Sequence, residues 1–177
     1  MIAFAPSPVI ETPRLRLRPT RRGDAAAIAR LANDPGVVRM TGSMPFPYTL
    51  ADAEAFLGRL SENDPARATV FAIERPDEGL IGTIGLSPNP EGRSELGYWL
   101  GRPYWGQGYA TAAARGALTF AAEAWGRRLV VAGHHADNDA SGWVLTKAGF
   151  LYTGEVKRTY SQARGGDVPT RMMVWLA

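Results

Sequence analysis

The chain reads Tyr104-Trp105-Gly106-Gln107-Gly108-Tyr109-Ala110-Thr111 at the junction of two apolar segments. Residues 95–100, just before it, have the pattern of a strand, and the alanine-rich residues 112–125, just after it, have that of a helix. A glycine-bearing turn between a strand and a helix leaves several main-chain N–H groups free at the positive end of the helix dipole. The segment therefore predicts a binding site for a phosphate or pyrophosphate.

The segments around this turn predict an alternation of strands and helices. Upstream, the expected elements are a strand at 14–18, helices at 24–33 and 51–60, and three antiparallel strands at 68–74, 80–86 and 94–100. Downstream, they are a helix at 109–124, a strand at 129–132, a helix at 138–148, and a hairpin of strands at 150–160 and 167–176. Gly116 lies inside the long helix, where glycine costs about 1 kcal/mol relative to alanine, so we expect tight packing there.

Composition limits the classes of protein to consider. The 177 residues suit a single domain, with 1–12 as a loose leader, and 45% apolar and 21% charged residues are ordinary for a soluble protein. The absence of cysteine excludes disulfides and a cysteine nucleophile, and only two histidines argue against a metal site. A net charge of +3 is compatible with nucleic acid or with an anionic cofactor. No apolar run approaches the roughly 18 residues of a membrane span, so we expect a cytoplasmic protein.

Four motifs, in this order and spacing, resemble those of the GNAT superfamily of acyl-CoA-dependent N-acetyltransferases. The branch most similar is the RimJ/RimL-like group, which acetylates ribosomal-protein N-termini. The motifs are Glu11-Thr12-Pro13-Arg14-Leu15-Arg16-Leu17-Arg18, Glu95-Leu96-Gly97-Tyr98-Trp99-Leu100, the glycine turn, and Asn138-Asp139-Ala140-Ser141 with Lys147-Ala148-Gly149-Phe150. The resemblance implies an α+β GNAT fold over residues 1–177. Its central sheet would be mixed, mostly antiparallel and seven-stranded, with a splayed middle and about four flanking helices.

The resemblance also implies acetyl-CoA as co-substrate, with no metal. In the family, the glycine turn binds the pyrophosphate through main-chain amides, and the strand before it offers main-chain groups to the pantetheine arm. Trp105 stands where the family usually has Gln or Arg. The residues expected at coenzyme A are Tyr98, Trp99, Leu100, Trp105, Gly106, Gln107, Gly108, Tyr109, Ala110, Thr111, Asn138 and Ser141.

Three residues are candidates for proton transfer. Glu95, in the strand beside the cofactor, would deprotonate the attacking amine, or else be a paired strand carboxylate. Ser141 would protonate the leaving thiolate, or serve with Asn138 only as a helix N-cap; the tyrosine that many relatives use for this is replaced by Leu145. His134 is a further catalytic candidate, with a structural role as its alternative.

The expected activity is acetyl transfer to a primary amine, of a peptide or protein N-terminus or of a small molecule, by direct attack in a ternary complex. We expect the loops at 42–48 and 160–166 to line the acceptor pocket of a monomer or homodimer, without membrane or nucleic-acid partners. The alternative is a non-catalytic module that senses acyl-CoA or associates with RNA. A dinucleotide-binding fold fits less well, because the turn lacks a third glycine and no acidic residue ends the next strand.

Overall fold

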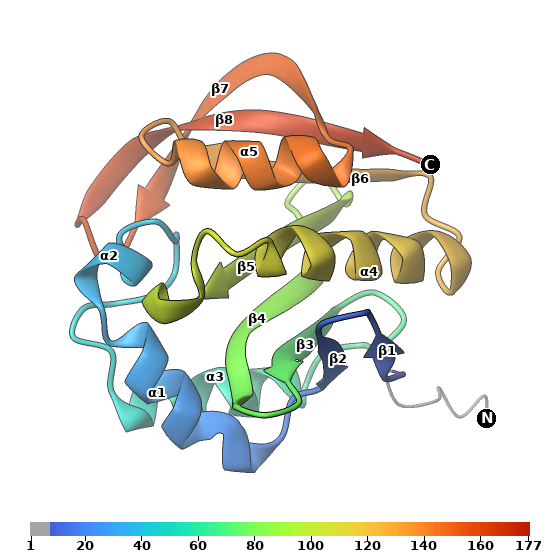
Figure 1. Ribbon diagram of the computed structural model, residues 1–177. Coiled ribbons are helices and arrows are strands. Elements are labelled where there is room, and N and C mark those ends of the chain that lie inside the picture. Colours follow the sequence, from blue (N-terminus) through green and yellow to red (C-terminus); the bar gives the residue numbers. More distant parts are fainter. Residues whose placement is uncertain (1–7) are drawn as a thin grey trace.

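The structure is a computed structural model that describes residues 8–177 (Figure 1). Within this range, the strands form one eight-stranded sheet in the order β1-β2-β3-β4-β5-β6-β8-β7. Neighbouring strands are antiparallel except β5 and β6, which are parallel. The strands are β1 (Ile10–Glu11), β2 (Arg16–Pro19), β3 (Thr69–Arg75), β4 (Gly79–Pro88), β5 (Ser94–Leu100), β6 (Leu129–His135), β7 (Leu151–Ser161) and β8 (Gly166–Leu176).

The additional strand relative to the predicted seven is β1, which pairs with β2. Ile10 and Glu11 fall within the segment that we expected to be a loose leader, and pairing with β2 orders them. A strand of two residues is too short for an alternating hydrophobic pattern, which is why the sequence did not indicate it. The first seven residues of that expected leader lie outside the described range.

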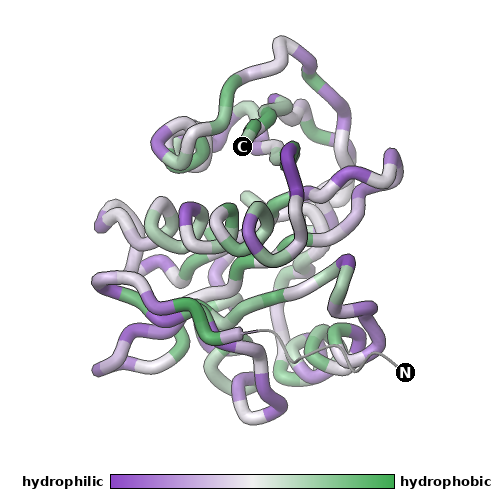
Figure 2. Tube along the Cα trace, turned by 90° about the vertical axis from the view of Figure 1, so that its right-hand side faces the viewer, coloured by the Kyte–Doolittle hydropathy of each residue, from purple (hydrophilic) through white to green (hydrophobic). Residues whose placement is uncertain are grey.

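Helices cover both faces of the sheet. On one face, α4 and α5 pack with β3, β4 and β5 around a core that includes Phe71, Ile84 and Phe150. On the other face, α1 and α3 pack around a second core that includes Ala72 and Trp99. The helices are α1 (Ala25–Ala32), α2 (Pro35–Val38), α3 (Leu50–Leu60), α4 (Tyr109–Glu123) and α5 (Asp139–Ala148). In the side view of Figure 2, hydrophilic residues lie in the connecting loops and also along the helices.

Small residues let α4 lie close to the sheet. Ala113, Ala117 and Ala121 form a fully buried stripe on the helix. A Cβ added at Gly116 would come within 3.1 Å of the Cδ1 atom of Leu17, which confirms the tight packing expected there. Close packing of α4 fixes the position of its N-terminus, where the glycine turn lies.

The sheet splays between β5 and β6. Only two residue pairs join these strands, Ser94 with Val130 and Glu95 with Val131, and beyond them the strands diverge. The predicted splay is therefore confirmed. It opens a gap in the middle of the sheet that is flanked by the N-termini of α4 and α5 (Figure 1). None of the helices between residues 8 and 177 has the length and apolar character needed to cross a membrane.

Candidate active site

The glycine turn forms an open cradle of main-chain N–H groups. Gly106 and Gly108 have φ values of 71° and 81°, and Gly108 is the N-cap of α4. No side chain caps this helix, and within residues 8–177 the main-chain N–H groups of residues 106–111 have no hydrogen-bond acceptor. A Cβ at Gly106 would meet no atom within 4 Å, so the turn is open to a ligand. Unpaired donors at a helix N-terminus suit a pyrophosphate.

Side chains around the turn hold its shape. The Arg14 guanidinium donates to the carbonyl oxygen of Gln107 over 2.6 Å and lies 4.3 Å from the ring centroid of Tyr109. The Trp105 indole donates to the carbonyl oxygen of Leu100 over 2.8 Å, which fixes the turn to the end of β5. Arg14 thus places a positive charge beside the cradle, and Trp105 has a structural contact that explains an aromatic residue at this position.

Arg102, which precedes the glycine turn, forms an ion pair with Asp34. Its Nε and Nη2 atoms donate to the two carboxylate oxygens of Asp34 over 2.7 and 2.6 Å. A bidentate pair of this kind holds the guanidinium in a fixed direction. The Asp34 carboxylate, whose pKa the Arg102 hydrogen bonds lower to about 2, stays charged at neutral pH. Arg102 therefore connects the glycine turn to the start of α2.

The end of β5 directs main-chain groups into the gap. The Gly101 N–H donates to the carbonyl oxygen of Ile81 on β4 over 2.9 Å. Main-chain groups of successive strand residues point to opposite sides, so Trp99 also faces β4, while Tyr98 and Leu100 face the gap. Main-chain groups of Tyr98, Trp99 and Leu100 were expected at the pantetheine arm. Of these three residues, Tyr98 and Leu100 direct their main-chain groups into the gap. The Trp99 indole is buried in the core on the α1 and α3 face.

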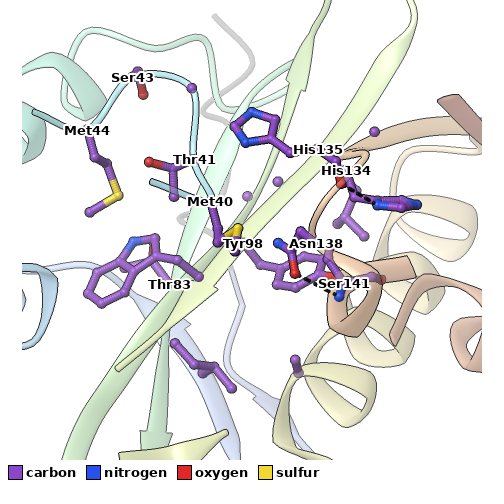
Figure 3. Close-up of a pocket in the computed structure, with 18 of the residues that line it drawn as sticks. Met40, Thr41, Ser43, Met44, Thr83, Tyr98, His134, His135, Asn138 and Ser141 are labelled. Atoms are coloured by element: carbon purple, nitrogen blue, oxygen red, sulfur yellow. Dashed lines mark hydrogen bonds between the residues drawn. The ribbon is translucent and has the colours of Figure 1, made fainter. Parts of the chain in front are cut away.

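Tyr98, Ser141 and Asn138 meet across the gap (Figure 3). The Tyr98 hydroxyl lies 2.7 Å from the Ser141 hydroxyl, and the Ser141 N–H donates to the Asn138 side-chain oxygen over 3.2 Å. Asn138 is thus the N-cap of α5, as the alternative reading expected, and its amide NH₂ group remains available as a donor. Burial raises the pKa of Tyr98 to about 12, so this hydroxyl stays protonated at neutral pH.

Glu95 lies on the opposite face of β5 from Tyr98. Alternation along the strand puts it on the same face as Trp99, toward α1 and α3. Its carboxylate makes no hydrogen bond to any residue in the described part of the chain, although it lies in the field of Lys157. Burial raises its pKa, so its charged form is less stable than that of an exposed glutamate. A half-buried, unpaired carboxylate of this kind is suited to accept a proton.

The two adjacent histidines have different surroundings. His134 is buried, and its Nδ1 lies 2.9 Å from the carbonyl oxygen of His135, so Nδ1 carries the proton. Its Nε2 then accepts from the Tyr152 hydroxyl over 2.9 Å. Both ring nitrogens of His134 are therefore occupied, which favours the structural alternative for this residue. His135 extends instead toward the loop that carries Thr41 and Ser43 (Figure 3), with Nδ1 3.2 Å from the carbonyl oxygen of Arg39.

A strap of hydrogen bonds borders the site beside His135. Arg164, in the β7–β8 turn, donates to both carboxylate oxygens of Asp137 over 2.9 and 3.0 Å and to the carbonyl oxygen of Arg39 over 2.8 Å. The Gln162 N–H donates to the carbonyl oxygen of Gly42 over 2.8 Å. We call residues 39–42 and 161–164 the strap. It holds the loop after α2 against the β7–β8 turn.

One cavity of about 1190 Å³ joins these groups. It extends from the glycine turn, through the gap between β5 and β6, to the strap. Both loops expected at the acceptor contribute to its lining, whereas Phe46 is half exposed to solvent. The lining residues from these loops are Gly42, Ser43, Met44, Pro45, Tyr48, Tyr160 and Gln162. Between residues 8 and 177, no cluster of three or more His, Asp or Glu side chains could hold a metal ion. Lining residues from the separate elements include Tyr48, Phe56, Thr83, Glu95, Gly97, Tyr98, Gly106, Gly108, His135, Asn138, Ser141 and Lys157.

Comparison with known proteins agrees with this geometry. A family model described as Acetyltransferase (GNAT) domain matches residues 14–151. The chain belongs to the GNAT acetyltransferase family. A Bacillus subtilis (strain 168) protein named Uncharacterized N-acetyltransferase YoaA is 30% identical over 171 residues, which cover 93% of this chain and 94% of that protein. GNAT acetyltransferases are acyltransferases, so the protein is an enzyme.

Two solved structures share the fold. Mycobacterium smegmatis RimJ, in complex with CoA-disulfide, superposes with a TM-score of 0.84 at 23% identity, covering 96% of this chain and 88% of that one. The ribosomal-protein-S5-alanine acetyltransferase from Vibrio fischeri gives a TM-score of 0.81 at 21% identity, covering 96% and 97%. The expected GNAT fold, with its mixed and mostly antiparallel sheet, is thus confirmed.

Two features of this GNAT site were not evident from the sequence. The first is the contact between the Tyr98 hydroxyl and Ser141, which are 43 residues apart. The second is the position of Arg14 at the glycine turn, 93 residues away in sequence. Local periodicity indicates the face on which a side chain lies but not its partner from a distant element. The only signal for Arg14 was its place in the Arg14–Arg18 motif of alternating arginines.

Proposed function

We propose that the protein transfers an acetyl group from acetyl-CoA to the primary amine of a peptide or protein N-terminus, or of a small amine, in a ternary complex. The observation that supports this is the continuity of one cavity, which reaches from the unpaired N–H groups of residues 106–111 to the Glu95 carboxylate. An anionic cofactor and an amine could therefore occupy the two ends together. Direct attack needs no covalent enzyme intermediate.

The residues present fit coenzyme A. The N–H groups of residues 106–111 would donate to the pyrophosphate, and Arg14 would add a positive charge beside it. The main chain of Tyr98 and the amide group of Asn138 would pair with the amides of the pantetheine arm. When bound, acetyl-CoA supplies the activated acyl carbon. Similarity to RimJ, which was solved with CoA-disulfide, supports the same cofactor here.

In this proposal, the proton transfer from the amine and the proton transfer to the sulfur take place on opposite faces of β5. On the α1 and α3 face, Glu95 removes a proton from the acceptor ammonium, so that the neutral amine forms the C–N bond. On the opposite face, the Tyr98–Ser141 pair gives a proton to the sulfur as the C–S bond breaks, and the second proton lost by the attacking nitrogen, passed on through water, restores the pair. Because burial raises the pKa of both Glu95 and Tyr98, the carboxylate becomes a better base and the phenol retains its proton.

The acceptor in this proposal is a chain-terminal α-amine in preference to a small amine. The similar fold of a ribosomal-protein-S5-alanine acetyltransferase supports this choice by analogy only. The further support is the extent of the cavity of about 1190 Å³, whose lining continues from Glu95 to Tyr48, Phe56 and Tyr160, beyond the residues expected at coenzyme A.

The test is a screen for thiol release from acetyl-CoA with peptides of different N-terminal residues and with small amines. We expect turnover with at least one class of acceptor and mass spectrometry to detect a gain of one acetyl group on its amine. The Glu95→Gln variant serves as the control for catalysis at this site. Saturable binding of acetyl-CoA without turnover on any amine would contradict the proposal.

A further inference from the structure

Three cross-strand pairs of β4 and β5 form the floor of the cavity on the α1 and α3 face. The pairs are Thr83 with Trp99, Gly85 with Gly97, and Ser87 with Glu95. All six residues line the cavity. A pair of glycines therefore lies between the aromatic residue at one end and the unpaired carboxylate at the other. We call these six residues the floor.

The two glycines of the floor differ in what surrounds them. A Cβ at Gly85 would come within 2.8 Å of the Cγ2 atom of Val70, so packing explains that glycine. A Cβ at Gly97 would have no heavy atom within 4 Å. The residue is exposed although it lies in a central strand, and its φ does not fall in the left-handed region. Neither packing nor backbone conformation thus requires glycine at position 97.

Glycine in the interior of a strand weakens the sheet and often marks a place where another backbone approaches closely. At position 97 such an approach would be from inside the cavity, between Glu95 and Trp99. The distance along β5 from Glu95 to Gly97 is about 7 Å, the length of two residues of an extended chain. An amine that reaches Glu95 along the floor therefore has the second residue of its chain above Gly97.

The charges near the floor suit a cationic chain end. Lys157, whose charge acts on Glu95, is paired with Glu91 over 2.7 Å. The floor itself offers hydroxyl groups from Thr83 and Ser87, and its one carboxylate is that of Glu95. A terminal ammonium would be attracted to the Glu95 end, while the rest of an acceptor chain would lie over the two glycines and extend toward Trp99.

We propose that Gly97 determines the acceptor, by letting the main chain of a polypeptide N-terminus lie across β5 with its α-amine at Glu95. This inference rests on the proposed acetyltransferase function and specifies its acceptor. A side chain at position 97 would obstruct an extended chain but not a compact amine bound at Glu95. Gly97 is thus a specificity residue and does not take part in the bond changes.

The experiment compares Gly97→Ala and Gly97→Val with the unsubstituted protein. The acceptors are a hexapeptide with a free α-amine and a compact amine such as ethanolamine, each with acetyl-CoA. We expect Gly97→Val to lower kcat/KM for the peptide at least about tenfold, with a smaller loss for Gly97→Ala, and to change kcat/KM for the compact amine less than about threefold. The Kd for CoA should not change, because the pyrophosphate cradle lies elsewhere.

Gly58→Val is the matched control. Gly58 lies on the exposed side of α3, and a Cβ there would also meet nothing within 4 Å. This variant should retain the acceptor preference of the unsubstituted protein. Gly97→Ala adds the least bulk, and a melting temperature close to that of the unsubstituted protein would show that it folds.

The outcomes separate this inference from the proposed function. Equal losses for both acceptors, or no loss with the peptide, would overturn the role of Gly97 and leave the acetyltransferase function intact. The same holds if the unsubstituted protein acetylates only compact amines. Failure of the unsubstituted protein to acetylate any amine would overturn the proposed function and this inference with it.

Discussion

The Tyr98 hydroxyl lies 2.7 Å from the Ser141 hydroxyl and so connects β5 to the first turn of α5 across the splay. Many GNAT enzymes carry a tyrosine on the helix, at the position that Leu145 occupies here, where the side chain is buried in the core. The hydroxyl in this protein comes from the neighbouring strand instead. Because burial raises the pKa of Tyr98 to about 12, the pair holds its protons across the physiological pH range.

Tyr98→Phe tests this pair. Removing the phenol hydroxyl should lower kcat by about 10²- to 10⁴-fold, the usual contribution of general acid catalysis, because the leaving sulfur loses its proton source. The Kd for CoA should change little. Single-turnover measurements of thiol release would separate chemistry from binding.

Ser141→Ala provides the control for the same pair. If Tyr98 and Ser141 act together, the double variant should be only slightly slower than the slower single variant, because both substitutions remove one shared hydrogen bond. Fully additive effects would show that the two hydroxyls act independently. Unchanged kcat in both single variants would remove the pair from the mechanism.

Gly108→Val tests the pyrophosphate cradle. The φ of 81° and a side chain beside the free N–H groups should together lower CoA affinity at least about tenfold, measured by calorimetry. Gly126→Val is the matched control, because Gly126 has a φ of 62°, meets nothing within 4 Å, and lies beyond the other end of α4. Both variants should lose about 1–2 kcal/mol of stability from the left-handed conformation. An equal loss of CoA affinity in both would argue against the cradle.

Glu95→Gln tests the base and has a defined pH dependence. The base must be deprotonated, so kcat/KM should fall as pH decreases through the pKa of Glu95, which burial raises above its ordinary value of 4.5. In the variant, kcat/KM should be about 10²- to 10⁴-fold lower at neutral pH, and this acidic limb should disappear. A pH profile at fixed, saturating acetyl-CoA would reveal both effects. If kcat/KM of the variant still falls at low pH, a group other than Glu95 is the base whose protonation causes that fall.

The order of the elements could be predicted from the sequence because each has its own local signal. The stripe of Ala113, Ala117 and Ala121 has helical spacing, and the structure buries these residues completely. Gly108 and Gly149 mark the start and the end of helices, and both have positive φ. The splay could be expected only from the family resemblance, since no local pattern says where two strands separate.

The side-chain chemistry of the site was harder to predict. Glu95 and Tyr98 lie on opposite faces of β5, which alternation predicts. The hydroxyl that contacts Tyr98, and the Lys157 charge that acts on Glu95, both come from elements distant in sequence. His134 and His135 are adjacent, so they face opposite sides of β6, and the sequence does not indicate which side faces the acceptor. In the structure, both ring nitrogens of His134 make hydrogen bonds, and the His135 side chain extends toward Thr41 and Ser43.

Arg164→Lys tests the strap. Lysine keeps the charge but cannot donate two parallel hydrogen bonds to Asp137, so the loop after α2 should become less well positioned. The pair is partly exposed, and the loss in stability should stay within about 1 kcal/mol in urea denaturation. We expect the KM for the acceptor to rise by about three- to tenfold while the Kd for CoA stays constant.

The control for the strap is Arg16→Lys, because Arg16 makes an exposed ion pair with Glu11 at 2.8 Å, at the β1 edge of the sheet. This variant should have an unchanged KM for the acceptor. If Arg164→Lys raises the Kd for CoA as much as the KM for the acceptor, the strap supports the whole fold and not the acceptor side alone.

Protonation of His135 should make the free energy of unfolding depend on pH. Burial, and then the charge of Arg164, lower its pKa below the ordinary value of 6.5, so the folded protein binds this proton less readily than the unfolded chain. As pH falls below 6.5, protonation therefore favours the unfolded state, and stability is lost until the pH reaches the folded pKa. His135→Gln removes this contribution, so its urea midpoint should fall less between pH 8 and pH 5 than that of the unsubstituted protein. An equal fall in both proteins would mean that other groups control the acid sensitivity.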